Sequence, residues 1–142
     1  MVHALNRAHR WLKPPSGRII DLRPAHVVAE VELGLPDGSI AAVGGLVVGD
    51  ERRQRHRAAD LAVSAVVQRG TLTVSAEREF PFYRYANSAD ELREYIATKW
   101  QHTHLDAATE ARAHEMMRAN PGARLWLRER VAIRNLLPAV AS

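Results

Sequence analysis

The stretch from Leu12 to Asp21, LKPPSGRIID, decides how the fold is interpreted. Before it, HALNRAHRWLK places apolar residues at spacings of three and four, which predicts one face of a helix that the two prolines end. After Gly17, the run GRIIDLRP predicts a short strand that stops at Pro24. A helix, a proline-containing turn and a strand in this order indicate a protein with both α and β structure.

Two β-rich runs follow this strand. They are HVVAEVEL over residues 26–33 and SIAAVGGLVV over residues 39–48, and the tetrapeptide LPDG at 35–38 separates them. Proline presets φ in such a turn and glycine accepts a positive φ, so we expect a hairpin. The glycine pair at 44–45 lies inside the second run, where it predicts a β-bulge or a point of close packing.

The remainder of the chain alternates helices and strands. We expect a helix over residues 51–69, a strand over 71–85, an insertion of helices over 89–119 and a last strand over 123–134. Even positions of the strand at 71–85 are mostly apolar, so one of its faces is expected to be buried.

The expected helix starts carry capping residues. Ser88 followed by Glu91 is a capping box, in which the serine side chain accepts from a backbone amide of the first turn and stabilises the helix by about 1 kcal/mol. Asp50 is the expected N-cap of the helix at 51–69, and a further helix is expected to start near Asp106.

The turn Leu12-Lys13-Pro14-Pro15-Ser16-Gly17 and the order of elements after it resemble the C-terminal half of class I S-adenosylmethionine-dependent methyltransferases. In that family a helix ends in a leucine-proline-glycine turn and leads into the fifth strand, and a helix, a sixth strand, an insertion and a final antiparallel strand follow. This sequence departs from the family where Pro15-Ser16-Gly17 replaces the glycine pair.

The resemblance implies an α/β fold, α+β in detail. It would be half of a Rossmann-like methyltransferase sheet with an added hairpin between residues 27 and 48 and with helices mainly on one face. Chain length predicts that residues 1–142 form a single domain.

The family's N-terminal half supplies a glycine-rich loop, whose backbone amides approach the cofactor beside a helix N-terminus, and an acidic residue for its ribose. No such segment is found in this sequence. The resemblance therefore implies a non-catalytic binding or assembly module without a bound cofactor. The alternative is the C-terminal part of a split methyltransferase, completed by a separately encoded N-terminal half; no catalytic residue is identified for either.

Composition narrows the remaining classes of function. The chain has no cysteine, which excludes disulfides, thiolate metal sites and cysteine nucleophiles. All but two of its basic residues are arginine, but its 16 acidic residues are interspersed with them, which argues against nucleic-acid binding. An anion- or nucleic-acid-binding protein remains a further alternative. No apolar run reaches about 18 residues, so we expect a cytoplasmic protein without a membrane span.

Arginines and aromatic residues gather at the strand ends where the family places its substrate. An arginine with aromatic rings can bind an anionic or planar ligand by forked hydrogen bonds and stacking. The alternative is that the rings fill a junction with the insertion helices and the arginines are solvated. The candidate ligand-binding residues are Arg23, His26, Tyr83, Tyr85, Arg124 and Trp126.

A metal site is not expected. His102, His104 and Asp106 fall at a predicted helix end and lack a specified further ligand, and His114 has no second histidine four residues on.

Both long strands carry a polar face. We expect Glu77 and Glu79 of one strand to pair with Arg124, Arg128 and Arg130 of the other on an uncovered sheet face.

Self-association as a homodimer is also expected, because the resemblance implies a sheet that lacks its covering half. A sheet without its covering half, with residues 40–48 at an unpaired edge, would be completed by a second copy.

Overall fold

In the computed structural model, residues 2–13, 16–25 and 28–139 are described. The chain forms two compact units. Unit 1 comprises Met1–Ala25, Gln54–Phe80 and Val131–Ser142, and unit 2 comprises His26–Arg53 and Pro81–Arg130. The single domain expected over the whole chain stays a prediction.

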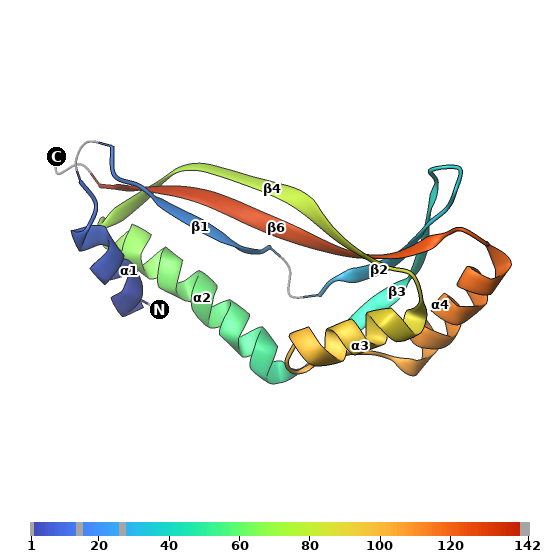
Figure 1. The fold of residues 1–142 in the computed structure, drawn as a ribbon. Coiled ribbons are helices and arrows are strands. Elements are labelled where there is room, and N and C mark those ends of the chain that lie inside the picture. Colours follow the sequence, from blue (N-terminus) through green and yellow to red (C-terminus); the bar gives the residue numbers. More distant parts are fainter. Residues whose placement is uncertain (1, 14–15, 26–27, 140–142) are drawn as a thin grey trace. The chain divides into compact units, whose positions relative to one another are not determined.

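The described residues contain a mixture of helices and strands (Figure 1). None of the helices in this part of the chain is long and apolar enough to cross a membrane. The helices are α1 (Val2–Arg10), α2 (Asp50–Gln68), α3 (Ala89–Lys99) and α4 (Ala107–Ala119), and the strands are β1 (Ile19–Pro24), β2 (Glu30–Gly34), β3 (Ile40–Val48), β4 (Leu72–Ala86), β5 (Thr103–Leu105) and β6 (Arg124–Pro138).

β6 is the central strand of the sheet. Its C-terminal part pairs antiparallel with β1, from Ile19 opposite Leu136 to Pro24 opposite Val131. Its N-terminal part pairs antiparallel with β2, which in turn pairs with β3, and β5 follows β3. β4 pairs with β6 outside this order. The mixed α and β content expected from the sequence is confirmed. The strand pairs β1–β6, β2–β3, β2–β6 and β3–β5 are all antiparallel.

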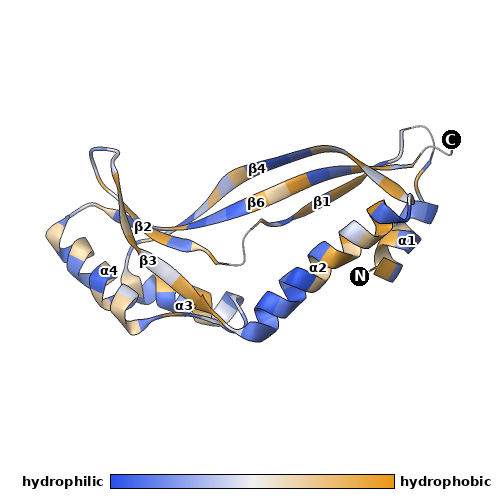
Figure 2. Cartoon of the chain, turned by 180° about the vertical axis from the view of Figure 1, so that it is seen from behind, coloured by the Kyte–Doolittle hydropathy of each residue, from blue (hydrophilic) through white to orange (hydrophobic). Residues whose placement is uncertain are grey.

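The core of unit 1 lies between α2 and its strands. Val63 and Val66 of α2 pack with Leu72 of β4 and Leu136 of β6. Figure 2 shows why α2 is suited to this position: its first turns are hydrophilic, whereas its second half carries the apolar residues. Burial of these side chains stabilises the packing of α2 on the sheet.

The core of unit 2 lies between α3, α4 and one face of the sheet. Leu125 and Leu127 of β6 are fully buried and belong to one cluster with Leu33 of β2 and Leu92 and Ile96 of α3. Since successive side chains of a strand point to opposite faces, Trp126 lies on the face of β6 that is turned away from this cluster.

Several local predictions are confirmed. The Ser88 hydroxyl accepts a hydrogen bond from the amide of Glu91 at 3.1 Å, and the Glu91 carboxylate accepts one from the amide of Asn87. The hairpin forms between β2 and β3, and its register shifts between Val31 and Glu32, which places a bulge in β3 beside the glycine pair at 44–45.

Other expectations are wrong in detail. β4 is exposed from residue 73 to residue 85, so neither of its faces is fully buried over this length. Part of the insertion at 89–119 is a short strand, β5, which covers β3 at residues 46–48, so this end of β3 is not the free edge that was expected. Asp50 is the first helical residue of α2 and not a residue before it.

Candidate functional site

Trp126 is held on the open face of unit 2 by its neighbours. It lies opposite Glu32 of β2, and the ring of Tyr83 of β4 meets its indole edge-on, with ring centroids 5.5 Å apart and an angle of 65°. Gly34 lies against the same indole, because a β-carbon at that position would be 2.7 Å from two ring carbons. The absence of a side chain at Gly34 therefore lets Trp126 pack closely on β2.

Tyr85 and Arg124 extend this surface. The Arg124 guanidinium lies over the Tyr85 ring, 5.5 Å from its centroid. In the part of the chain that the structure describes, Arg124 forms no ion pair with a carboxylate. A cation that stacks on an aromatic ring and has no carboxylate partner can pair with an anionic ligand.

These four side chains line one hollow of about 390 Å³, which we call the Trp126 hollow. Pockets of a few hundred Å³ suit small ligands, and this one is lined by rings and a guanidinium. The sequence prediction that Tyr83, Tyr85, Arg124 and Trp126 gather at one place agrees with this geometry, although ligand binding itself stays a prediction.

A second hollow, of about 320 Å³, lies where β4 meets α3. We call it the Tyr95 hollow; it is lined by Tyr83, Arg84, Tyr85, Ala86, Glu91, Leu92 and Tyr95. The Arg84 guanidinium lies 5.1 Å from the centroid of Phe82 and 5.5 Å from that of Tyr95, and it is 3.4 Å from Glu129. Of these residues, only Tyr83 and Tyr85 were predicted from the sequence as ligand-binding residues. Arg84 and the residues of α3 were missed, because the approach of α3 to β4 is a tertiary property.

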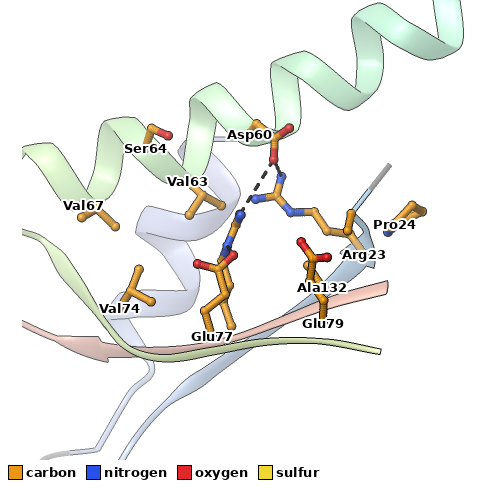
Figure 3. Close-up of a pocket in the computed structure, with 12 residues that line it drawn as sticks. Arg23, Pro24, Asp60, Val63, Ser64, Val67, Val74, Glu77, Glu79 and Ala132 are labelled. Carbon is orange, nitrogen blue, oxygen red and sulfur yellow. Dashed lines mark hydrogen bonds and ion pairs between the residues drawn. The ribbon is translucent and has the colours of Figure 1, made fainter. Parts of the chain in front are cut away.

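Arg23 does not belong to this surface. It is in unit 1, where its guanidinium is 3.0 Å from Asp21 and 3.0 Å from Asp60 of α2. Figure 3 shows the contact with Asp60. The Arg23 side chain is 12% exposed, and its Nη atoms donate no hydrogen bond within the described residues, so the two contacts act as ion pairs. Arg23 therefore does not line the Trp126 hollow, because its ion pairs with Asp21 and Asp60 hold it beside α2, and ligand binding by Arg23 stays a prediction. His26 lies outside the described residues.

Arg134 continues the charge cluster of unit 1. It donates a hydrogen bond of 2.6 Å to Glu77 and lies 3.7 Å from Asp21 and 3.8 Å from Asp60. Burial lowers the pKa of Arg134, but the hydrogen bond to Glu77 and the three carboxylates raise it above the ordinary value of arginine. The hollow beside this cluster, about 360 Å³, is lined by apolar residues and by three acids and two arginines, and both arginines already contact carboxylates (Figure 3).

The cross-strand pairs expected on an uncovered face are formed differently. Glu77 pairs with Arg134, and Figure 3 shows Glu77 and Glu79 on the side of the strands that faces α2. Arg128 pairs with Glu30 and Glu32 of β2. The register of β6 against β2 brings these acids to Arg128, which sequence alone did not specify.

One group of potential metal ligands is found in the described residues. Asp90, Glu110 and His114 lie within 4.8 Å of one another, but Arg93 donates hydrogen bonds of 2.9 Å to Asp90 and 2.7 Å to Glu110. The guanidinium therefore already supplies the positive charge that a metal ion would bring.

The histidines considered from the sequence serve other contacts. His102 is 2.8 Å from Glu51, and Asp106 caps α4 by accepting from the backbone and the hydroxyl of Thr109. These hydrogen bonds lower the pKa of the Asp106 carboxyl.

Comparisons with protein-family models, with curated proteins and with solved structures give no match for this chain. The functional interpretation therefore rests on the chain's own residues and geometry.

Proposed function

We propose that the chain is a non-catalytic binding module whose ligand presents a planar group to Trp126 and Tyr83 and an anionic group to Arg124. The observation that carries this proposal is the Trp126 hollow, where three aromatic rings and a guanidinium without a carboxylate partner line one space. Aromatic faces take planar groups by stacking, and arginine pairs with anions through two parallel hydrogen bonds.

We also propose that the module is methyltransferase-like. Two observations support the resemblance. Glu77 contacts Arg134 and Arg84 contacts Glu129, so β4 and β6 run antiparallel, as the family's last strands do. β1 also runs antiparallel to β6, so β1 and β4 share a direction, and the connection between them contains the β2–β3 hairpin followed by the helix α2.

The ligand site can be tested with naphthalene-2-carboxylate and its neutral amide. We expect the carboxylate to bind more tightly than the amide. Trp126→Ala should weaken the binding of both compounds by about tenfold. Arg124→Gln should weaken only the binding of the carboxylate, by about fivefold. Isothermal calorimetry measures the affinities, and circular dichroism checks that each variant is folded.

A matched control is Trp11→Ala, since Trp11 is in unit 1 and 80% exposed. It should bind both compounds like the wild type. Equal affinity for acid and amide, or unchanged binding by the Trp126 variant, would contradict the proposed site.

A second candidate function, assembly, is favoured by β1. Within the described residues β1 pairs only with β6, and Ile20 and Leu22 on its outward face are 53% and 58% exposed. An unpaired edge with exposed apolar side chains favours addition of another strand. We propose a homodimer through β1; the alternative occupant is a separately encoded N-terminal methyltransferase half.

Leu22→Lys should convert the dimer to a monomer, because a charged side chain on the edge strand β1 opposes pairing with a second copy. Light scattering at several micromolar concentrations measures the mass. Val47→Lys is the control, since Val47 is a comparably exposed strand residue of unit 2. A wild-type monomer at every concentration would contradict the homodimer and favour the split-methyltransferase alternative.

A further inference from the structure

We infer that the outer edge of β4 over residues 81–86 binds an extended acidic peptide as an added strand, whose successive side chains enter the Trp126 hollow and the Tyr95 hollow in turn. This inference rests on the proposed function, because it uses the Trp126 hollow, and it specifies the class of ligand as a segment of a protein partner.

The first observation is the edge itself. β4 pairs with β6 and with no other described strand, so its second row of backbone donors and acceptors is unpaired. Residues 81–85 are exposed, and Pro81, which lacks an amide hydrogen, is tolerated in a strand at such an edge. An unpaired edge is the surface to which extended peptides add by main-chain hydrogen bonds.

The second observation is that two hollows flank the same residues of this edge. Tyr83 and Tyr85 line both of them. The Trp126 hollow continues over β6 to Arg124 and Trp126, on the face turned away from the core, whereas the Tyr95 hollow continues to α3 on the opposite face. Because the side chains of a strand alternate between faces, adjacent residues of an added strand would enter different hollows.

The third observation is the charge of the two hollows. Arg124 has no carboxylate partner in the described part of the chain, so the Trp126 hollow favours an acidic side chain. In the Tyr95 hollow, Arg84 is paired with Glu129 and Glu91 accepts from Asn87, while the ring of Tyr95 offers apolar surface. An apolar side chain fits there, so the peptide alternates acidic and apolar residues.

The test uses the full chain and a blocked peptide of the sequence Thr-Glu-Leu-Glu-Leu-Thr. One control peptide has the same composition in the order Thr-Glu-Glu-Leu-Leu-Thr. Two others carry N-methyl groups on alternate amides, one on the odd and one on the even positions, which blocks the hydrogen bonds of one edge at a time. Calorimetry gives the affinities, and NMR amide shifts locate the binding.

We expect the alternating peptide to shift the amides of residues 82–86. The reordered peptide and one of the two N-methylated peptides should bind at least about tenfold more weakly, since each loses side-chain register or main-chain bonds. Arg124→Gln should weaken the glutamate peptide at least about fivefold and leave a glutamine version unchanged.

Several results would overturn the inference. Equal binding of both N-methylated peptides would exclude strand addition. Amide shifts confined to residues outside β4 and outside the two hollows would also exclude it. Pairing of β4 with a second copy of this chain in the absence of peptide would replace the proposed occupant. If naphthalene-2-carboxylate binds in a Trp126-dependent way and no peptide binds, strand addition is wrong and the proposed function stands; if neither binds, both are wrong.

Discussion

Arg23→Met is expected to lower the free energy of unfolding by about 2–3 kcal/mol. The arginine lies between Asp21 and Asp60, each 3.0 Å away, and methionine would leave the Asp21 carboxylate, 18% exposed, with only a more distant cation. Loss of one partner of a fully buried pair costs roughly 3–5 kcal/mol. The value here is lower because Asp60 is half exposed and Arg134 remains 3.7 Å from Asp21.

Urea denaturation followed by circular dichroism measures this loss. Arg57→Met is the control, because Arg57 lies on the exposed side of α2. The double variant Asp21→Leu, Arg23→Met should recover most of the stability, since it removes the uncompensated charge together with its partner. If Arg23→Met matched the control, Arg23 would have no structural role, and the original prediction of a ligand-binding arginine would regain support.

Gly44→Ala is expected to lower the free energy of unfolding by about 1–3 kcal/mol, the usual cost of overpacking. A β-carbon at position 44 would lie 2.3 Å from the hydroxyl oxygen of Thr109, which is 6% exposed. Thr109 has little freedom to move, because its hydroxyl and its amide both donate to Asp106. The added methyl group must therefore displace α4 from β3.

Gly45→Ala is a close control, because its nearest neighbour, the carbonyl oxygen of Ala29, would lie 3.8 Å from the added carbon. Its cost should not exceed the roughly 1 kcal/mol range of an ordinary strand substitution. In a double-mutant cycle, Thr109→Ala should relieve part of the cost of Gly44→Ala, with a coupling energy of about 1 kcal/mol. Equal losses at positions 44 and 45 would show that the contact with Thr109 is not the cause.

Local patterns were sufficient to predict most helices and strands. The capping pair Ser88 and Glu91 and the turn at 35–38 act through neighbours close in sequence, so their roles can be predicted without a three-dimensional arrangement. The exposure of β4 could not be read in this way. Its alternation of apolar and polar residues is typical of a half-buried strand, but burial depends on which helix lies above it, and that is a tertiary property.

Only part of the candidate site was predicted from the sequence, because the rest depends on tertiary structure. Tyr83, Tyr85, Arg124 and Trp126 lie near the ends of two strands that pair with each other, so the pairing of those strands brings them together. The position of Arg23 depends on Asp60, a residue of α2 that approaches β1 only in the folded chain. Gly34 has a role only once the β2–β6 register is known, because that register decides which ring lies above it.

The central position of β6 sets the order in which this protein can fold. Ile19, near the N-terminal end of the described chain, pairs with Leu136, and Glu30 pairs with Arg128. During synthesis β1, β2 and β4 leave the ribosome before β6, their shared pairing partner, and contacts so distant in sequence form slowly. We therefore expect the helices and the hairpin of β2 and β3 to form early, while the sheet is completed only after translation has passed β6. Until β6 is synthesised, the unpaired edges of β1, β2 and β4 can aggregate or be bound by chaperones.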